Sequence, residues 1–113
     1  MDIFDKTIAI EQAGGSKELA KDLFEMLLKD LPEMQSILNS SFSGKKTQAF
    51  WDIAHKIHGS TAYCGTTQLK AACKQLEDAI ISDDKIAMKN HLETVNNEIS
   101  LLTQQGPDLL SSI

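Results

Sequence analysis

The chain has 113 residues, 42% of them hydrophobic, and a formal net charge of −5, which suits one domain with one modest core. No apolar run approaches the ~20 residues of a membrane span, and residues 1–12 carry acids where a secretory leader would have a basic flank and an apolar core. The lysines are scattered, which disfavours nucleic acid as a partner, so we expect a cytoplasmic domain that contacts another protein and makes no direct membrane contact.

Helical signals recur along the chain between clear breaks, and strand signals are nearly absent. The first predicted helix runs from Asp5, as N-cap, to Ala13, and Gly14-Gly15 ends it. Ser16 can cap the second helix, in which Pro32 should produce a kink or a split. The apolar stripe of this second helix is predicted to be Leu19, Leu23, Leu27, Met34 and Leu38.

A polar connection over residues 40–44 leads to a third helix, predicted from about residue 45 to residue 63. Gly65 should stop this helix, Thr66 can cap the fourth, and residues 82–84 form the next turn. We expect Gly106-Pro107 to terminate the last helix, which leaves residues 105–113 as a loosely held tail. The predicted core positions of the last two helices are Leu69, Cys73, Leu76 and Ile80, then Met88, Leu92, Val95, Ile99 and Leu102.

Short connections favour antiparallel neighbours in helical proteins. The sequence therefore predicts an all-α fold: an antiparallel up-and-down four-helix bundle over residues 1–104, with an additional short N-terminal helix. Cys64 and Cys73 fall on predicted core stripes and are too few for a disulfide framework or a zinc site. We interpret both cysteines as small buried hydrophobic residues.

His55 lies on the wrong side of its helix for a core residue. At about 100° per residue, its ring points roughly 150° away from the middle of the apolar stripe. Gly59, one turn later, has no side chain to shield the ring. No Ser or Cys shares this face, so His55 is a poor general base, but its neutral ring nitrogen can attack phosphorus. The stripe itself is Phe50, Ile53, Ala54, Ile57, Thr61 and Cys64.

The segment Ala54-His55-Lys56-Ile57-His58-Gly59-Ser60, with Gly65 and Leu69 after it, resembles the histidine-containing phosphotransfer (HPt) domain. It is most similar to the C-terminal HPt modules of BarA-type hybrid sensor histidine kinases, and the resemblance runs from about Phe4 to about Leu102. The chain departs from the family's motif at one position: it has His58 where the family usually has a lysine.

The resemblance implies a phosphorelay carrier. In that role His55 accepts a phosphoryl group from an aspartate of a receiver domain and passes it to the aspartate of a response regulator. It also implies a bacterial phosphoprotein with no ATP site and no enzyme activity of its own. No cofactor is expected, because the Mg²⁺ belongs to the partner receiver. We expect the isolated domain to be a monomer.

The predicted hairpin between the third and fourth helices supplies a neighbour for His55. A tight turn near residue 65 brings residues whose numbers sum to about 132 level with each other, and this places Glu77 beside His55. Glu77 either orients the imidazole, fixing its tautomer and raising its basicity, or is a solvated glutamate. By the same rule Lys74 is level with His58 and Lys70 with Ala62.

The remaining site positions keep two interpretations each. His58 either helps to neutralise phosphoryl charge, as the family's lysine does, or is a surface residue. Lys70 or Lys74 can supply that charge instead. Trp51 either packs along the helix surface or anchors a partner. Lys56, Ser60 and Ala62 complete the expected partner-binding set, and His91 is interpreted as a surface residue.

Two other functions compete with that of a phosphocarrier. A self-sufficient kinase or phosphatase would need a phosphate-binding loop and an acidic Mg²⁺ cluster, and the sequence has neither. A non-catalytic interaction bundle, or a metal-binding module using His55, His58 and Glu77, is the other alternative. We expect the two histidines to point outward, whereas metal ligands in bundles project inward, so no metal is predicted.

Overall fold

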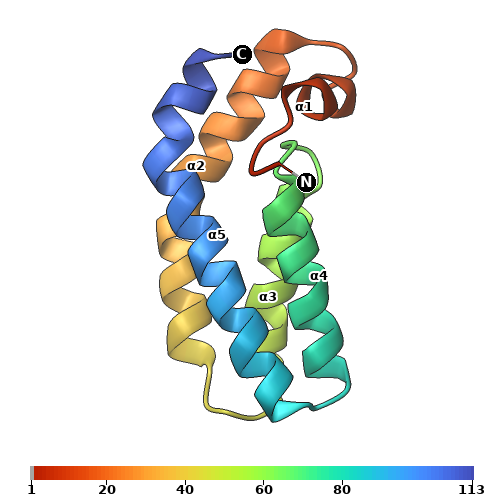
Figure 1. Cartoon of the computed structure of the whole chain (residues 1–113), viewed down its shortest axis with the longest axis vertical. Coiled ribbons are helices and arrows are strands. Elements are labelled where there is room, and N and C mark those ends of the chain that lie inside the picture. The colour runs from red at the N-terminus through yellow and green to blue at the C-terminus, as the bar shows by residue number, and fades with distance from the viewer. Residues whose placement is uncertain (1) are drawn as a thin grey trace.

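The computed structural model describes residues 2–113, and its helices form an antiparallel bundle. Helices α2 to α5 run up and down, and the short α1 lies at the end of the bundle that holds the C-terminus (Figure 1). The predicted four-helix bundle with an extra N-terminal helix is confirmed. Within residues 2–113, every helix is too short or too polar to cross a membrane. The helices are α1 (Lys6–Gln12), α2 (Lys17–Ser41), α3 (Gln48–Thr61), α4 (Thr67–Ile81) and α5 (Lys85–Ser111).

The predicted caps of the first two helices are present. An Asp5 carboxylate oxygen accepts from the Ile8 N–H at 3.0 Å, and Ser16 Oγ accepts from the Leu19 N–H at 3.1 Å. These bonds satisfy backbone donors that have no partner inside the helix.

Helix α2 continues through Pro32 without a break, so the alternative of a split helix is wrong. The apolar face of α2 is buried both before and after Pro32, and this packing against the bundle stabilises α2 as one continuous helix. The prediction for Leu19 is also wrong, because that side chain is 45% exposed. The buried stripe of α2 consists of Ala20, Phe24, Leu27, Leu31, Met34 and Leu38.

The stripes predicted for the other three bundle helices are confirmed, since every residue named for them is buried. Helices α3 and α4 pack against each other as a hairpin, and α5 packs against both α4 and α2. Cys64 and Cys73 are buried and free, as expected. With the apolar side of α3 turned inward, the opposite side of that helix carries the candidate site to the surface.

The turn between α3 and α4 is held by the N-terminal segment. The Asp5 N–H donates to the Gly65 carbonyl at 2.8 Å, and the Gly65 N–H donates to Gln12 Oε1 at 3.1 Å. Gly65 has a φ of 68°, in the left-handed region that glycine adopts without strain. The N-terminal segment therefore fixes the hairpin that brings α3 and α4 into register.

Thr66 occupies the N-cap position of α4, but its side chain makes no capping hydrogen bond, so that prediction is wrong. The Asp2 carbonyl takes over the role. It accepts from the Gln68 N–H at 3.2 Å and from the Thr67 hydroxyl at 2.6 Å. A distant backbone oxygen thus satisfies a donor at the start of α4.

Gly65→Ala is expected to lower the free energy of unfolding by about 2–3 kcal/mol. An added Cβ would lie 2.4 Å from the Asp5 carbonyl oxygen and 2.9 Å from the Ala9 Cβ. Urea denaturation measures the loss. Gly14→Ala is the matched control, because Gly14 also has a positive φ, of 70°, but open space around it. Equal losses in the two variants would show that close packing does not require Gly65.

The predictions for the C-terminus are wrong. Helix α5 does not end at Gly106-Pro107 but continues to Ser111, so the expected loose tail is helical. Gly106 lets α5 approach α2 closely, since a Cβ there would lie 2.7 Å from Leu28 Cδ2. Packing of this end of α5 stabilises the helix by more than it loses through the backbone hydrogen bond that Pro107 cannot donate. The last apolar side chains, Leu109, Leu110 and Ile113, pack against the core.

Candidate functional site

His55 lies on the exposed side of α3, as predicted. Its side chain is 65% exposed, and Thr47 caps the helix by accepting from the Phe50 N–H at 3.2 Å. Gly59, one turn further along, is also exposed, and a Cβ built on it would meet nothing within 4 Å. One edge of the imidazole is therefore open to an approaching molecule.

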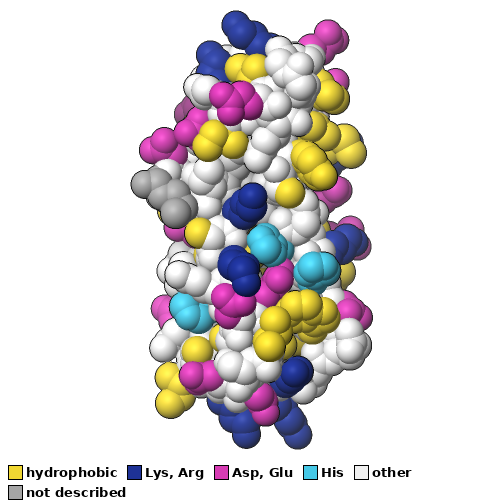
Figure 2. Space-filling model, turned by 90° about the vertical axis from the view of Figure 1, so that its right-hand side faces the viewer, with side chains coloured by type: hydrophobic (Ala, Val, Ile, Leu, Met, Phe, Trp, Pro, Cys, Tyr) yellow, Lys and Arg dark blue, Asp and Glu magenta, His cyan; other side chains and the backbone are white. Residues whose placement is uncertain are grey.

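Glu77 reaches across from α4 and meets two histidines of α3. Its Oε1 lies 3.3 Å from His55 Nδ1 and is also hydrogen-bonded to His58 Nδ1. The Glu77 side chain is only 8% exposed. The predicted pairing of Glu77 with His55 is confirmed, and the solvated alternative is wrong. On this face of the molecule, histidine side chains lie beside acidic and lysine side chains near the middle of the bundle (Figure 2).

These contacts define which ring nitrogen of His55 faces outward. A carboxylate oxygen accepts, so each Nδ1 bonded to it donates. In a neutral imidazole the other nitrogen, Nε2, then carries the lone pair. For His55, Nε2 is the nitrogen turned away from Glu77, and a lone pair there is a nucleophile without any further base.

Trp51 packs along the helix surface and stacks on the His55 ring. The two ring centroids are 5.3 Å apart, and the planes are inclined by 12°. The His55 ring is therefore held on two sides, by an indole face and by the Glu77 carboxylate. The alternative of Trp51 as a partner anchor stays a prediction.

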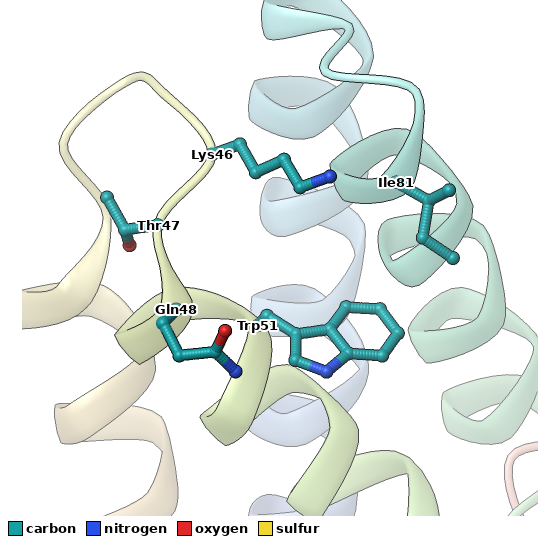
Figure 3. Close-up of a pocket in the computed structure, with 5 residues that line it drawn as sticks. All are labelled: Lys46, Thr47, Gln48, Trp51 and Ile81. Atoms are coloured by element: carbon teal, nitrogen blue, oxygen red, sulfur yellow. The ribbon is translucent and has the colours of Figure 1, made fainter.

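Trp51 also borders a surface pocket that sequence reasoning missed. Figure 3 shows its indole, the Lys46 side chain and Ile81 around the space between the start of α3 and the end of α4. Ile81 is 60% exposed. The rule that level residues of the hairpin have numbers summing to about 132 could have found this pocket. It places Ile81 level with Trp51, just as it places Glu77 level with His55.

His58 is not a surface residue, because its side chain is 22% exposed and its Nδ1 is bound to Glu77. It borders a groove together with Lys70 and Lys74, which places both lysines on the flank of α3 that carries His58. The Lys74 ammonium donates to Asp78 at 2.6 Å, and this hydrogen bond raises the pKa of Lys74.

The other predicted partner-binding residues lie elsewhere along α3. Lys56 is exposed, and its carbonyl accepts from the Ser60 hydroxyl at 2.9 Å. Ser60 borders a depression against α2, on the flank opposite the lysines. Ala62 is half-buried where α3 ends. His91 is half-buried on α5, borders a different pocket and is not part of the group around Glu77. The structure therefore distributes the set around His55 and does not gather it into one pocket.

An antiparallel bundle that presents an oriented histidine beside an open glycine has the architecture of a phosphotransfer domain. The family model of the Hpt domain matches residues 22–105 of the chain. The chain therefore belongs to the Hpt family, and it functions in phosphorelay signal transduction.

The chain is similar to parts of two bacterial kinases. It is 35% identical over 81 residues to the signal transduction histidine-protein kinase BarA of Escherichia coli K12, an alignment that covers 72% of this chain and 9% of the kinase. It is 30% identical over 84 residues to the sensor histidine kinase GacS of Pseudomonas protegens, covering 74% of this chain and 9% of the kinase. The chain thus spans about a tenth of the length of these relatives.

A solved structure confirms the fold. The HPT domain of a sensor hybrid histidine kinase from Shewanella superposes with a TM-score of 0.87, over 98% of this chain and 96% of that domain. The two sequences are 20% identical, so this likeness concerns the arrangement of the helices.

Proposed function

We propose that His55 Nε2 is the phosphoryl acceptor of this domain. Its lone pair attacks the phosphorus of an aspartyl phosphate on a receiver domain, so that an N–P bond forms as the bond from phosphorus to the aspartate oxygen breaks. The reverse step delivers the group to the aspartate of a second receiver. The observation that carries this proposal is the exposed His55 ring, whose Nδ1 is held by buried Glu77.

Glu77 acts on this reaction as a positioning residue. Attack through Nε2 leaves positive charge on the ring, and the Nδ1–H that remains can donate to the Glu77 carboxylate throughout. Phosphoryl transfer needs positioning and charge neutralisation more than covalent machinery. The domain therefore acts as a phosphocarrier without ATP binding, and the Mg²⁺ comes with the receiver.

The partners that fit this site are the receiver domain of a hybrid sensor kinase and that of a response regulator. BarA and GacS, which the chain resembles over about a tenth of their length, are both named as histidine kinases. A receiver would approach over Gly59, with Trp51 and Lys56 beside the reacting ring. Lys70 and Lys74 lie on the His58 flank, where their charge favours a phosphorylated partner. We propose that the domain acts as a monomer in this exchange.

Transfer from a purified phosphorylated receiver tests the proposal. The domain is expected to acquire a label that is labile in acid and stable in base, as a phosphoramidate is, and to lose it when an unphosphorylated receiver is added. Incubation with labelled ATP alone is the control and should give no label. Labelling by ATP alone, or none from any receiver in a broad panel, would contradict the assignment.

Glu77→Ala is expected to slow transfer by at least tenfold, because the His55 ring loses the group that orients it. Glu77→Gln should recover much of that loss, since its amide oxygen still accepts from Nδ1–H. Both rates are measured with the same phosphorylated receiver, and thermal unfolding checks that both variants fold. Equal rates in the Ala and Gln variants would show that the oxygen acceptor is not what matters.

A further inference from the structure

The contacts of Glu77 bring three possible metal ligands to one place. The ligand atoms of His55, His58 and Glu77 all lie within 4.8 Å of one another. Two of the three side chains are largely buried, at 22% exposed for His58 and 8% for Glu77. The expectation that the two histidines point outward is therefore wrong for His58. Its ring turns towards α4 because the Glu77 carboxylate lies there.

We propose that His55, His58 and Glu77 form a binding site for a divalent transition metal ion, Zn²⁺ first among them, and that the bound ion blocks phosphoryl acceptance. The metal site stands on the geometry of the three side chains. The block on acceptance rests in addition on the proposed function of His55.

The donor set suits this class of ion. Two imidazole nitrogens and one carboxylate oxygen make a common three-ligand zinc set, with a fourth position left to water. His55 and His58 are three residues apart on one helix, and Glu77 comes from the neighbouring helix. Metal sites in helical bundles share the i, i+3 spacing and the ligand from a facing helix, but their ligands project inward, whereas this cluster lies at the surface, with His55 65% exposed.

With zinc bonds of about 2.0–2.1 Å, two ligand atoms of one tetrahedral ion lie about 3.3 Å apart. His55 Nδ1 and Glu77 Oε1 already have this separation, at 3.3 Å. The His58 Nδ1–Glu77 hydrogen bond must open to admit the ion, and the two histidine nitrogens must settle at the same spacing. The exposed His55 side chain can rotate to do so.

Metal binding at Nδ1 changes the His55 tautomer. The protons that the two rings donate to Glu77 leave Nδ1 of His55 and of His58, and each ring takes up one proton at Nε2, so the rings neither gain nor lose protons overall. The metal ion then holds both Nδ1 lone pairs. Nε2 of His55 now carries hydrogen and has no lone pair for attack on phosphorus. Metal binding and phosphoryl acceptance are therefore mutually exclusive.

Other ligands in the molecule compete poorly with this cluster. Among residues 2–113, no second group of three His, Cys, Asp or Glu side chains converges in the same way. Burial raises the pKa of Cys64 to about 11 and, together with the charge of Glu77, that of Cys73 to about 12, so both remain thiols at neutral pH. A thiol binds zinc far less well than a thiolate.

Direct titration tests the metal site. The metal-free 113-residue chain is titrated with Zn²⁺ in competition with a chromophoric chelator, and we expect one saturable site per chain. His58→Gln and Glu77→Gln should each weaken binding by at least tenfold, since each removes one of three ligands. His91→Gln is the matched control and should bind as the unaltered chain does. Absence of saturable binding, or equal affinity in all four proteins, would overturn the proposal.

A second measurement tests the block on acceptance. Phosphoramidate, a small phosphoryl donor, replaces the receiver so that zinc cannot act on the receiver's own Mg²⁺ site. The rate of phosphorylation should fall in proportion to zinc occupancy and recover when a chelator is added. The His58→Gln variant should need at least tenfold more zinc to reach the same fractional inhibition, measured relative to its own metal-free rate.

The two halves of the proposal fail separately. Saturable zinc binding without inhibition would refute the block and leave the metal site standing. A metal-free chain that no phosphorylated receiver labels at His55 would refute the proposed function, while the zinc titration still decides the site.

Discussion

His55→Gln is expected to abolish phosphoryl acceptance while the helical content stays unchanged. Glutamine has no ring nitrogen that can form a phosphoramidate. The His55 side chain is 65% exposed, so its replacement costs little buried apolar surface, and the free energy of unfolding should change by about 1 kcal/mol or less. Labelling by a phosphorylated receiver measures acceptance, and circular dichroism measures the helical content.

Two further histidine variants make this test specific. His91→Gln removes a histidine on α5 and should leave labelling intact. His58→Gln removes the second hydrogen bond to Glu77 and should still give label, at a reduced rate. Label that persists in His55→Gln, or that maps to His58 or His91 in the unaltered chain, would refute the assignment of His55.

Gly59→Leu is expected to slow transfer from a receiver by on the order of a hundredfold, because a misplacement of about 1 Å in the reacting groups has an effect of this size. The new side chain would stand one turn from the His55 ring, on the face that the receiver must approach. A Cβ at this position meets nothing within 4 Å, and leucine favours a helix interior over glycine by several tenths of a kcal/mol. The variant should therefore be at least as stable as the unaltered chain.

The size of the donor separates blocked docking from a damaged site. Phosphoramidate is small enough to pass the leucine, so its rate with Gly59→Leu should stay within a few-fold of the original. Ser100→Leu adds the same side chain to an exposed position on α5 and is the control for surface hydrophobicity. Normal receiver transfer in Gly59→Leu would show that open approach is not the role of Gly59.

The register of the α3–α4 hairpin shows how far local rules reach. Helical periodicity placed His55 opposite the core, and the rise per residue placed Glu77 level with it. The same rule applied to Trp51 yields Ile81, which borders the neighbouring pocket. These features follow from the chain alone, because helix geometry is the same in every context and the position of the turn is marked by Gly65.

Other features depend on how whole helices pack. The hydrogen bond between His58 and Glu77 depends on how α3 and α4 are oriented about their axes relative to each other, which helical periodicity does not define. The Asp2 carbonyl replaced the predicted cap at Thr66 because the N-terminal segment folds back onto the hairpin.

The sequence by itself determined the order of the helices, the inward faces of α3, α4 and α5, the exposed histidine and its level partner, since all of these arise from local periodicity and short connections. Only the tertiary structure decided the end of α5, which continues through Pro107 to Ser111 while Leu109, Leu110 and Ile113 pack against the core. It alone also brought His58 to the carboxylate that holds His55. Both outcomes depend on contacts between helices, whose free energies are comparable with the local preferences they override.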